Sequence, residues 1–218
     1  MPNVRAGVPN VPGGAIVEIA RLAPVFRPLV GLSLAFRQPS LINVGGETKI
    51  EFNENVPLRN QAAVVNTVTG ASAIQEFLEN SEWVSQSGNP VVYAVHLRKK
   101  PLAGVTAKSV IIQVARGDQT VPNPTSTAII RAGDLAGNTT LFRNDLAFAA
   151  NSAVPKNPHV FLTNLAVPSA APFAVAGQRQ IATFFASDGA VVVDPDEAAP
   201  FFETPVKLPL PEDLGFIP

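Results

Sequence analysis

Apolar positions become regular only after the first 68 residues. Residues 1–68 consist of short apolar runs broken by Asn, Gly and Pro. Within them, residues 13–26 predict a short helix that Pro24 would end, and residues 28–36 are apolar without a clean period. We therefore expect residues 1–68 to form an irregular, lid-like segment rather than an independent domain.

Helical and strand patterns dominate from residue 69 onward. The stretch 69–88 has apolar residues near helical spacing, with Thr69 or Ser72 as a candidate N-cap and Gly88 as a stop. Residues 89–97 form a short apolar stretch. Alternating strands and helices then follow, over residues 109–115, 125–137, 139–145 and 171–189.

This alternation predicts an α/β fold. Residues 109–115 are apolar on both faces, as a buried parallel strand should be, and Gly189 would end the last helix. A strand–helix–strand–helix order predicts a parallel sheet with right-handed crossovers. We expect residues 69–189 to form this part, followed by a Pro- and acid-rich tail, 190–218, that wraps the surface.

Composition narrows the classes of function. Apolar residues make up 46% of the chain, charged residues only 15%, and the net charge is −1, so no basic surface for nucleic acid is expected. The longest apolar runs fall far short of the roughly 20 residues of a transmembrane helix. The lack of cysteine excludes disulfides, thiolate metal sites and a cysteine nucleophile, and leaves the compartment open.

Two chemically important residues follow the two predicted strands. Asp118 comes just after the first strand, and His159 lies in the loop after the second. Ligands of parallel sheets bind at the carboxyl ends of strands. A carboxylate that orients an imidazole, which in turn accepts the proton of a serine, makes up two thirds of a hydrolase triad. The plainer interpretation makes Asp118 a turn former and His159 a surface residue.

The surrounding residues resemble those of a known superfamily. The run IIQVARGDQTVPN resembles the acid loop of α/β-hydrolases, in which an apolar strand is followed by a small residue, Asp, two residues and Val-Pro. The run NPHVFL resembles their histidine loop, and acid before histidine is the family order. Residues 69–189 thus resemble the carboxy-terminal portion of a bacterial esterase- and lipase-like branch, although Ala115 stands where glycine is common.

The nucleophile of that family is missing from the chain. It occupies G-x-S-x-G between a strand and a helix, and no such pentapeptide occurs here. The nearest, GLSLA, contains Ser33 but lies between Pro28 and Pro39, and GASAI at 70–74 lacks a preceding strand. We expect Ser33 to lie out of reach of His159.

The resemblance implies a serine hydrolase of small carboxylic esters, with Asp118 and His159 as catalytic residues held within about 2.6–3.2 Å of each other. The serine and the oxyanion hole would come from elsewhere, so we expect the chain alone to be inactive. Its partner would be a missing N-terminal half, or a second copy bound along the sheet edge. No cofactor or metal is expected, because two histidines and no cysteine offer no convincing ligand set. His96 precedes the acid, so a structural role is expected.

Two alternatives remain open at this stage. One is a non-catalytic binding or interaction module that keeps hydrolase-like elements. The other is a serine peptidase of the same fold, whose acid and histidine loops would look alike.

Overall fold

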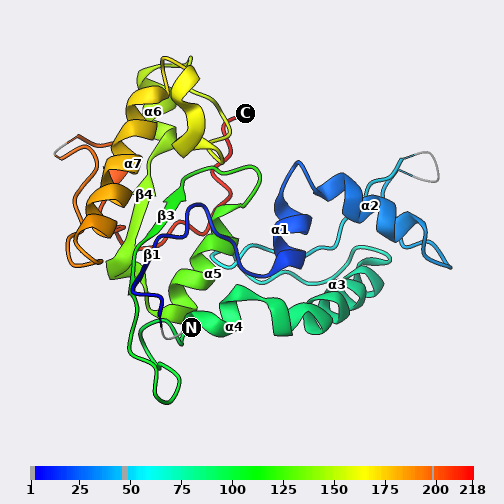
Figure 1. Cartoon of the computed structure of the whole chain (residues 1–218). Coiled ribbons are helices and arrows are strands. Elements are labelled where there is room, and N and C mark those ends of the chain that lie inside the picture. Colours follow the sequence, from blue (N-terminus) through cyan, green and yellow to red (C-terminus); the bar gives the residue numbers. More distant parts are fainter. Residues whose placement is uncertain (1–2, 46–48, 198) are drawn as a thin grey trace.

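A computed structural model of the chain describes residues 3–45, 49–197 and 199–218. It has two small neighbouring sheets with helices on both faces, and a helical lobe beside them (Figure 1). The strands are β1 (Ala6–Gly7), β2 (Ser109–Val110), β3 (Ile112–Ala115), β4 (Thr139–Phe142) and β5 (Phe202–Glu203).

The strands form two sheets, a parallel pair of β1 and β2 and a mixed sheet in the order β3-β4-β5. β3 pairs in parallel with β4, as the alternating pattern predicts, whereas the parallel pairing of β1 with β2 was not expected. β5 is antiparallel to β4. Beyond β1 the chain continues beside β3, where the N–H of Val11 donates to the carbonyl of Gln113 (2.7 Å). Residues near both ends of the sequence therefore flank the central strands.

Helices cover both faces of this sheet. They are α4 (Pro90–Ala94), α5 (Asn123–Gly133), α6 (Asn144–Ala150) and α7 (Ala171–Ala186), with short 3-10 helices η2 (Ala136–Asn138) and η3 (Phe161–Ala166). α5 links β3 to β4, as predicted. α7 ends at Ala186 with Ser187 as its C-cap, so Gly189, expected to cap this helix, lies two residues further on. The φ of Gly189 is 80°, and its N–H donates to the carbonyl of Phe184 (2.7 Å).

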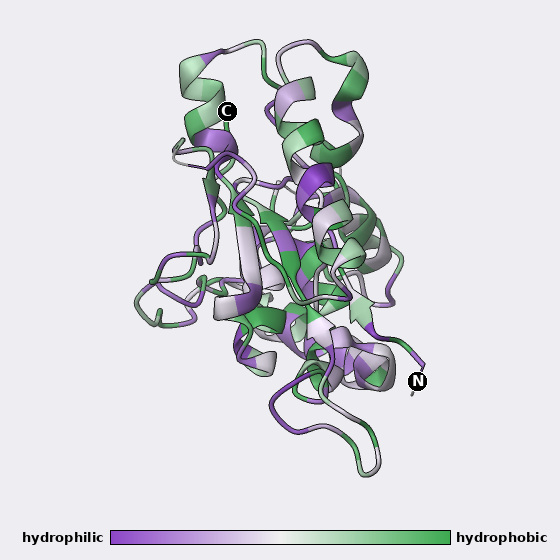
Figure 2. Ribbon diagram, turned by 60° about the vertical axis from the view of Figure 1, so that its left-hand side comes forward, coloured by the Kyte–Doolittle hydropathy of each residue, from purple (hydrophilic) through white to green (hydrophobic). Residues whose placement is uncertain are grey.

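Each face of the sheet has its own apolar core. On one face, Ile112 and Val114 of β3 pack with Ile129 and Ile130 of α5. On the other, Phe142 packs against Phe161, Phe173 and Phe202, each ring centroid 5.1 Å from that of Phe142. Apolar and polar residues both occur along the central strands in Figure 2.

A buried amide network accounts for the polar residue in β3. Gln113 donates to the carbonyl of Gly177 (3.1 Å) and to Oε1 of Gln180 (2.8 Å), both on α7. Gln180 in turn donates to Oγ1 of Thr140 (2.9 Å). Because buried amides without partners are costly, this network fixes α7 on the sheet.

The helical lobe contains α1 (Ile16–Leu22), α2 (Arg27–Ala35), α3 (Ala71–Ser85) and the 3-10 helix η1 (Gln86–Gly88). Leu34, Phe52, Ile74 and Leu78 form its core. α1 and α3 lie within the predicted ranges 13–26 and 69–88 but are shorter at both ends, and Gly70, not Thr69 or Ser72, occupies the N-cap of α3.

A buried ion cluster ties this lobe together. Glu54 accepts from Arg21 (2.8 Å) and Arg27 (2.8 Å), and the guanidinium of Arg27 lies over the ring of Phe52. Burial disfavours the charge of Glu54, but hydrogen bonds from Arg27 and Arg21 outweigh it and hold the pKa of this carboxyl below its ordinary value.

Packing divides the chain differently from the expected segments. α3 lies after residue 68 but packs in the lobe with α1 and α2. Residues 6–11, expected in a lid-like segment, pair with the central strands. The expected surface tail, 190–218, contributes β5 to the sheet. Each of these placements depends on contacts between residues far apart in the sequence, which local patterns do not report.

Some apolar side chains of the lobe remain uncovered. Leu29 and Leu32 of α2 are exposed, as are Val25 before this helix and Phe36 at its C-cap. Within the described ranges, no helix is both long and apolar enough to cross a membrane.

Candidate active site

Asp118 is held rigidly just beyond the carboxyl end of β3. Gly117, with φ of 79°, turns the chain there. The Asp118 Oδ1 atom accepts from the N–H groups of Thr120 and Val121, at 2.8 Å each. The residue is 1% exposed. The Asp118 carboxylate therefore stabilises the turn that follows β3 through Oδ1. Its other oxygen, Oδ2, is left for another partner.

That partner is His159. Its Nδ1 atom lies 2.9 Å from Oδ2 of Asp118, which confirms the predicted distance. The path to it differs from the prediction: the strand expected over 139–145 ends at Phe142, and α6 precedes the histidine loop. Helix α6 carries the chain away from the sheet before the loop returns it to the acid.

The contact fixes the chemistry of the imidazole. A carboxylate only accepts hydrogen bonds, so in this contact Nδ1 of His159 is the donor and Nε2 is the ring nitrogen left for another partner. The His159 side chain is 29% exposed, whereas that of Asp118 is 2% exposed. The basic nitrogen therefore belongs to a reachable residue, and the orienting carboxylate is shielded from water.

Buried asparagines anchor both loops. Asn123 accepts from the N–H of Gly117 (3.1 Å) through Oδ1. Asn144 donates through Nδ2 to the carbonyls of Pro155 (3.2 Å) and Lys156 (3.3 Å). Sequence reasoning did not single out these residues, because an isolated Asn is equally typical of a surface turn.

The segment 212–218 crosses both loops. Asp213 pairs with Arg116 (2.8 Å) beside the acid, and Asn123 donates to the carbonyl of Asp213 (2.9 Å). Gln119 donates to the carbonyl of Ile217 (3.3 Å), and Lys156 of the histidine loop donates to Pro218. This segment thus bridges the two loops that carry the pair.

Charged residues brace the ends of the strands. Arg143, which follows β4, binds Asp145 (2.7 Å) and Glu203 of β5 (2.8 Å). The hydrogen bonds that Arg143 donates to Asp145 and Glu203 raise the pKa of Arg143, against the effect of burial. Burial opposes the charge of Asp145, but Arg143 outweighs it and lowers the pKa of that carboxyl. Arg143 and Asp145 therefore remain charged near neutral pH, and the pair of Arg143 with Glu203 holds β5 against the end of β4.

The other sequence candidates lie elsewhere. Ser33 is on the exposed part of α2 and donates to the carbonyl of Leu29 within its own helix (3.1 Å). In Figure 1, α2 lies at the far side of the molecule from α6. His96 Nδ1 lies 2.7 Å from the carbonyl of Lys100, a bond that closes a turn.

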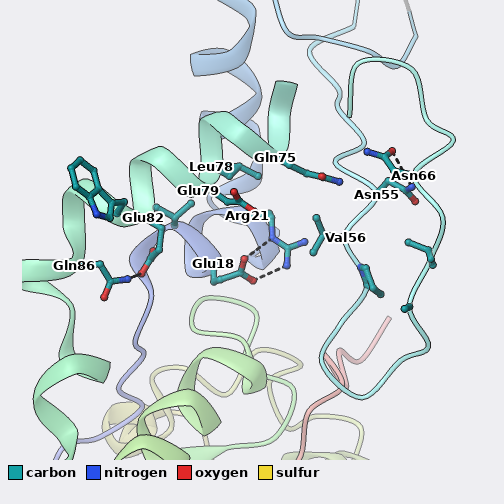
Figure 3. A pocket seen from close by; sticks show the side chains of 15 residues that line it. Glu18, Arg21, Asn55, Val56, Asn66, Gln75, Leu78, Glu79, Glu82 and Gln86 are labelled. Carbon is teal, nitrogen blue, oxygen red and sulfur yellow. Dashed lines mark hydrogen bonds and ion pairs between the residues drawn. The ribbon is translucent and has the colours of Figure 1, made fainter. Parts of the chain in front are cut away.

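A separate hollow opens in the helical lobe (Figure 3). Its volume is about 680 Å³, and it lies between α1, α3 and the segment 55–66. Glu18 and Arg21 pair within it (2.6 Å), and Gln75 reaches across to donate to the carbonyl of Glu54 (2.7 Å). Neither Asp118 nor His159 lines this hollow.

Comparison of the chain with protein-family models, curated proteins and solved structures finds no match. In the part of the chain that the structure describes, no three His, Cys, Asp or Glu residues are grouped to hold a metal ion. The Asp118–His159 pair at the carboxyl edge of β3 is therefore the arrangement from which a function must be argued.

Proposed function

We propose that this chain supplies the acid and the base of a Ser-His-Asp hydrolase of α/β-hydrolase type, acting on small carboxylic esters. The observation that carries the proposal is the 2.9 Å contact between Asp118 Oδ2 and His159 Nδ1. The pair follows parallel neighbours β3 and β4, joined through α5, as the resemblance implies. The nucleophilic serine belongs to another segment or chain.

The roles follow from the geometry of the pair. His159 Nε2 accepts the serine proton as the hydroxyl attacks the ester carbonyl, and the oxygen of the serine forms the new bond to carbon. His159 then donates that proton to the departing alcohol, which leaves an acyl-enzyme for water to cleave. Asp118 stays ionised, holds the proton on Nδ1 and stabilises the imidazolium.

The polypeptide that would carry the nucleophilic serine could bind at a sheet edge of this chain. Residues 6–11 and β5 flank the central strands, and exposed sheet edges readily pair with other strands. A chain or segment carrying the serine would extend the sheet at the edge formed by residues 6–11. A second copy of this chain is the other occupant of that edge.

The test is complementation. The chain is mixed with a polypeptide carrying G-x-S-x-G from the same locus, and hydrolysis of short p-nitrophenyl esters is measured. We expect activity only in the mixture, lost in His159→Ala and reduced by several orders of magnitude in Asp118→Asn. His96→Ala is the matched control and should remain active.

The same mixture separates esterase from peptidase, since p-nitroanilide peptides replace the ester in a parallel assay. Activity that survives His159→Ala would refute the proposed role of the pair. A mixture that cleaves neither substrate class would leave the second candidate function.

That second candidate is a non-catalytic binding module, favoured by the hollow in the lobe. Trp83, the single tryptophan of the chain, lines this hollow, as do Val56 and Leu78. If the hollow binds small apolar molecules, n-octanol should saturably shift the Trp83 emission. Val56→Arg should abolish that shift, whereas Val92→Arg, an exposed site on α4 outside the hollow, should not.

A further inference from the structure

The acid and the histidine sit on separate loops, so something must set the distance between them. Each loop has its own anchor, in Asn123 and Asn144. Each asparagine binds backbone groups of only one of the two loops. Asn123 also contacts the segment 212–218. The spacing between the loops therefore depends on the segment 212–218, which bridges them from outside, and on contacts made directly between the two loops.

Asn157 connects the two loops through one side-chain amide. Its Oδ1 accepts from the N–H of Gln119 on the acid loop (3.1 Å) and from the N–H of His159 itself (3.2 Å). Its Nδ2 donates to Oγ1 of Thr120 (3.1 Å). All three bonds are partly buried, where hydrogen bonds are better protected from competing water.

The partners of Asn157 are the immediate neighbours of the pair. Gln119 follows Asp118 directly, and the N–H of Thr120 is already bound by the Asp118 carboxylate (2.8 Å). Thr120 is therefore held by Asp118 through its backbone and by Asn157 through its hydroxyl. A shift of the Asn157 amide would move the turn that fixes the carboxylate and the backbone that carries the imidazole at the same time.

We propose that Asn157 is a positioning residue, which sets the spacing between Asp118 and His159 and thereby the tautomer of the imidazole. Its consequence for catalysis rests on the proposed function. Its effect on the histidine does not, because that effect is measurable in this chain without serine or substrate.

Chemically graded substitutions separate positioning from folding. Asn157→Ala removes all three hydrogen bonds. Asn157→Asp keeps both acceptor roles, and the Thr120 hydroxyl can rotate to donate to the new carboxylate. Thr120→Val removes one bond only. Asn151→Ala is the matched control, since Asn151 also accepts from a backbone N–H two residues on, that of Ala153 (3.0 Å), without contact to the pair.

The readout is the ¹⁵N and ¹H spectrum of the two histidines. His96 Nδ1 faces a carbonyl, which only accepts, so it gives an internal reference for an Nδ1–H imidazole. We expect His159 to be an Nδ1–H tautomer in the wild type, in Asn157→Asp and in Asn151→Ala. In Asn157→Ala we expect mixed tautomers and exchange of the Nδ1 proton with solvent at least about tenfold faster. The His96 signals should stay unchanged.

The proposal would be overturned if a folded Asn157→Ala variant kept the wild-type His159 tautomer and the wild-type exchange rate of its Nδ1 proton. It would also be overturned if Asn151→Ala changed the His159 signals as much as Asn157→Ala does. If Asn157→Ala does not fold, Thr120→Val and Asn157→Asp decide. Faster exchange of the His159 Nδ1 proton in Thr120→Val, together with wild-type exchange in Asn157→Asp, supports positioning. Any other combination overturns the proposal. In a complemented, active enzyme, Asn157→Ala should lower kcat by up to about 100-fold with KM unchanged, as expected when reacting groups are misplaced.

Discussion

The Nδ1 atom of His159 lies 2.9 Å from Oδ2 of Asp118, although 41 residues separate them in the chain. The separation is bridged by α5, β4 and α6, and β4 runs parallel to β3. Because parallel neighbours end at the same edge of a sheet, this topology returns the chain to the acid. The contact is thus a product of the fold rather than of local sequence.

The two oxygens of Asp118 have separable tasks, which predicts different effects for two substitutions. Asp118→Asn keeps an acceptor for the N–H groups of Thr120 and Val121, so the fold should persist while the new amide faces His159. We expect the imidazole to switch to the Nε2–H tautomer, seen in its ¹⁵N shifts. Asp118→Ala also strands both N–H groups and should cost about 1–3 kcal/mol in urea unfolding. Equal stability of the two variants would contradict this division.

Gly117 is required for two reasons that a paired substitution can separate. Its φ is 79°, and a Cβ there would lie 2.5 Å from the carbonyl oxygen of Gly215. Gly104 has φ of 74° with open space around it. Gly104→Ala should therefore lower the free energy of unfolding only by the cost of a positive φ, about 1–2 kcal/mol. Gly117→Ala should cost roughly 1–3 kcal/mol more, because a backbone carbonyl obstructs it.

Chemical denaturation of both variants measures that difference, and limited proteolysis should show the segment 212–218 released in Gly117→Ala only. If the two alanines cost the same, the close approach of Gly215 is not a constraint on the acid loop.

The lobe should depend strongly on Glu54. The Arg21 and Glu54 side chains are 5% and 7% exposed, so Glu54→Gln leaves the buried Arg21 guanidinium with Glu18 as its remaining carboxylate partner and should cost about 1–3 kcal/mol. The lowered pKa of Glu54 adds a pH dependence: its stabilisation is present above the ordinary value of 4.5 and is lost as pH falls through the lowered value. Urea unfolding at neutral and acidic pH measures both effects.

An exposed pair provides the control for Glu54. Arg5 and Asp188 are 77% and 62% exposed, so Arg5→Gln should leave stability unchanged within error. A loss in Arg5→Gln comparable to that in Glu54→Gln would mean that burial does not distinguish these pairs.

Asp196 should show the opposite pH dependence. Burial and the neighbouring carboxyl of Asp194 raise its pKa, against hydrogen bonds from the N–H groups of Phe201 and Phe202. A raised pKa gives stability that is present below the ordinary value of 3.8 and lost as pH rises through the raised value. Asp196→Asn should therefore raise Tm by a few degrees at neutral pH and give no gain near pH 3. Thermal unfolding across pH tests this, with Asp188→Asn as an exposed control.

The parts of the fold that the sequence predicts are those with long local patterns. The buried run 109–115, the helix at 171–189 and the acid after the first strand are each visible in consecutive residues. β1 and β5 are two residues long, so they show no alternation, and only their distant partners define them. The role of Asn157 could not be predicted for a related reason: it depends on contacts with Gln119 and Thr120 on the other loop.

The pairing of residues 6–11 with β3, and of β5 with β4, has a consequence for how the protein is made. These contacts join residues far apart in sequence, and topologies rich in such contacts fold slowly. On the ribosome, β3 and β4 emerge before β5 and before the segment 212–218 that straps the two loops. During synthesis, β3 and β4 therefore expose apolar residues that β5 does not yet cover, which favours aggregation. Cool growth and chaperone supply should therefore decide the yield of folded protein more than its final stability does.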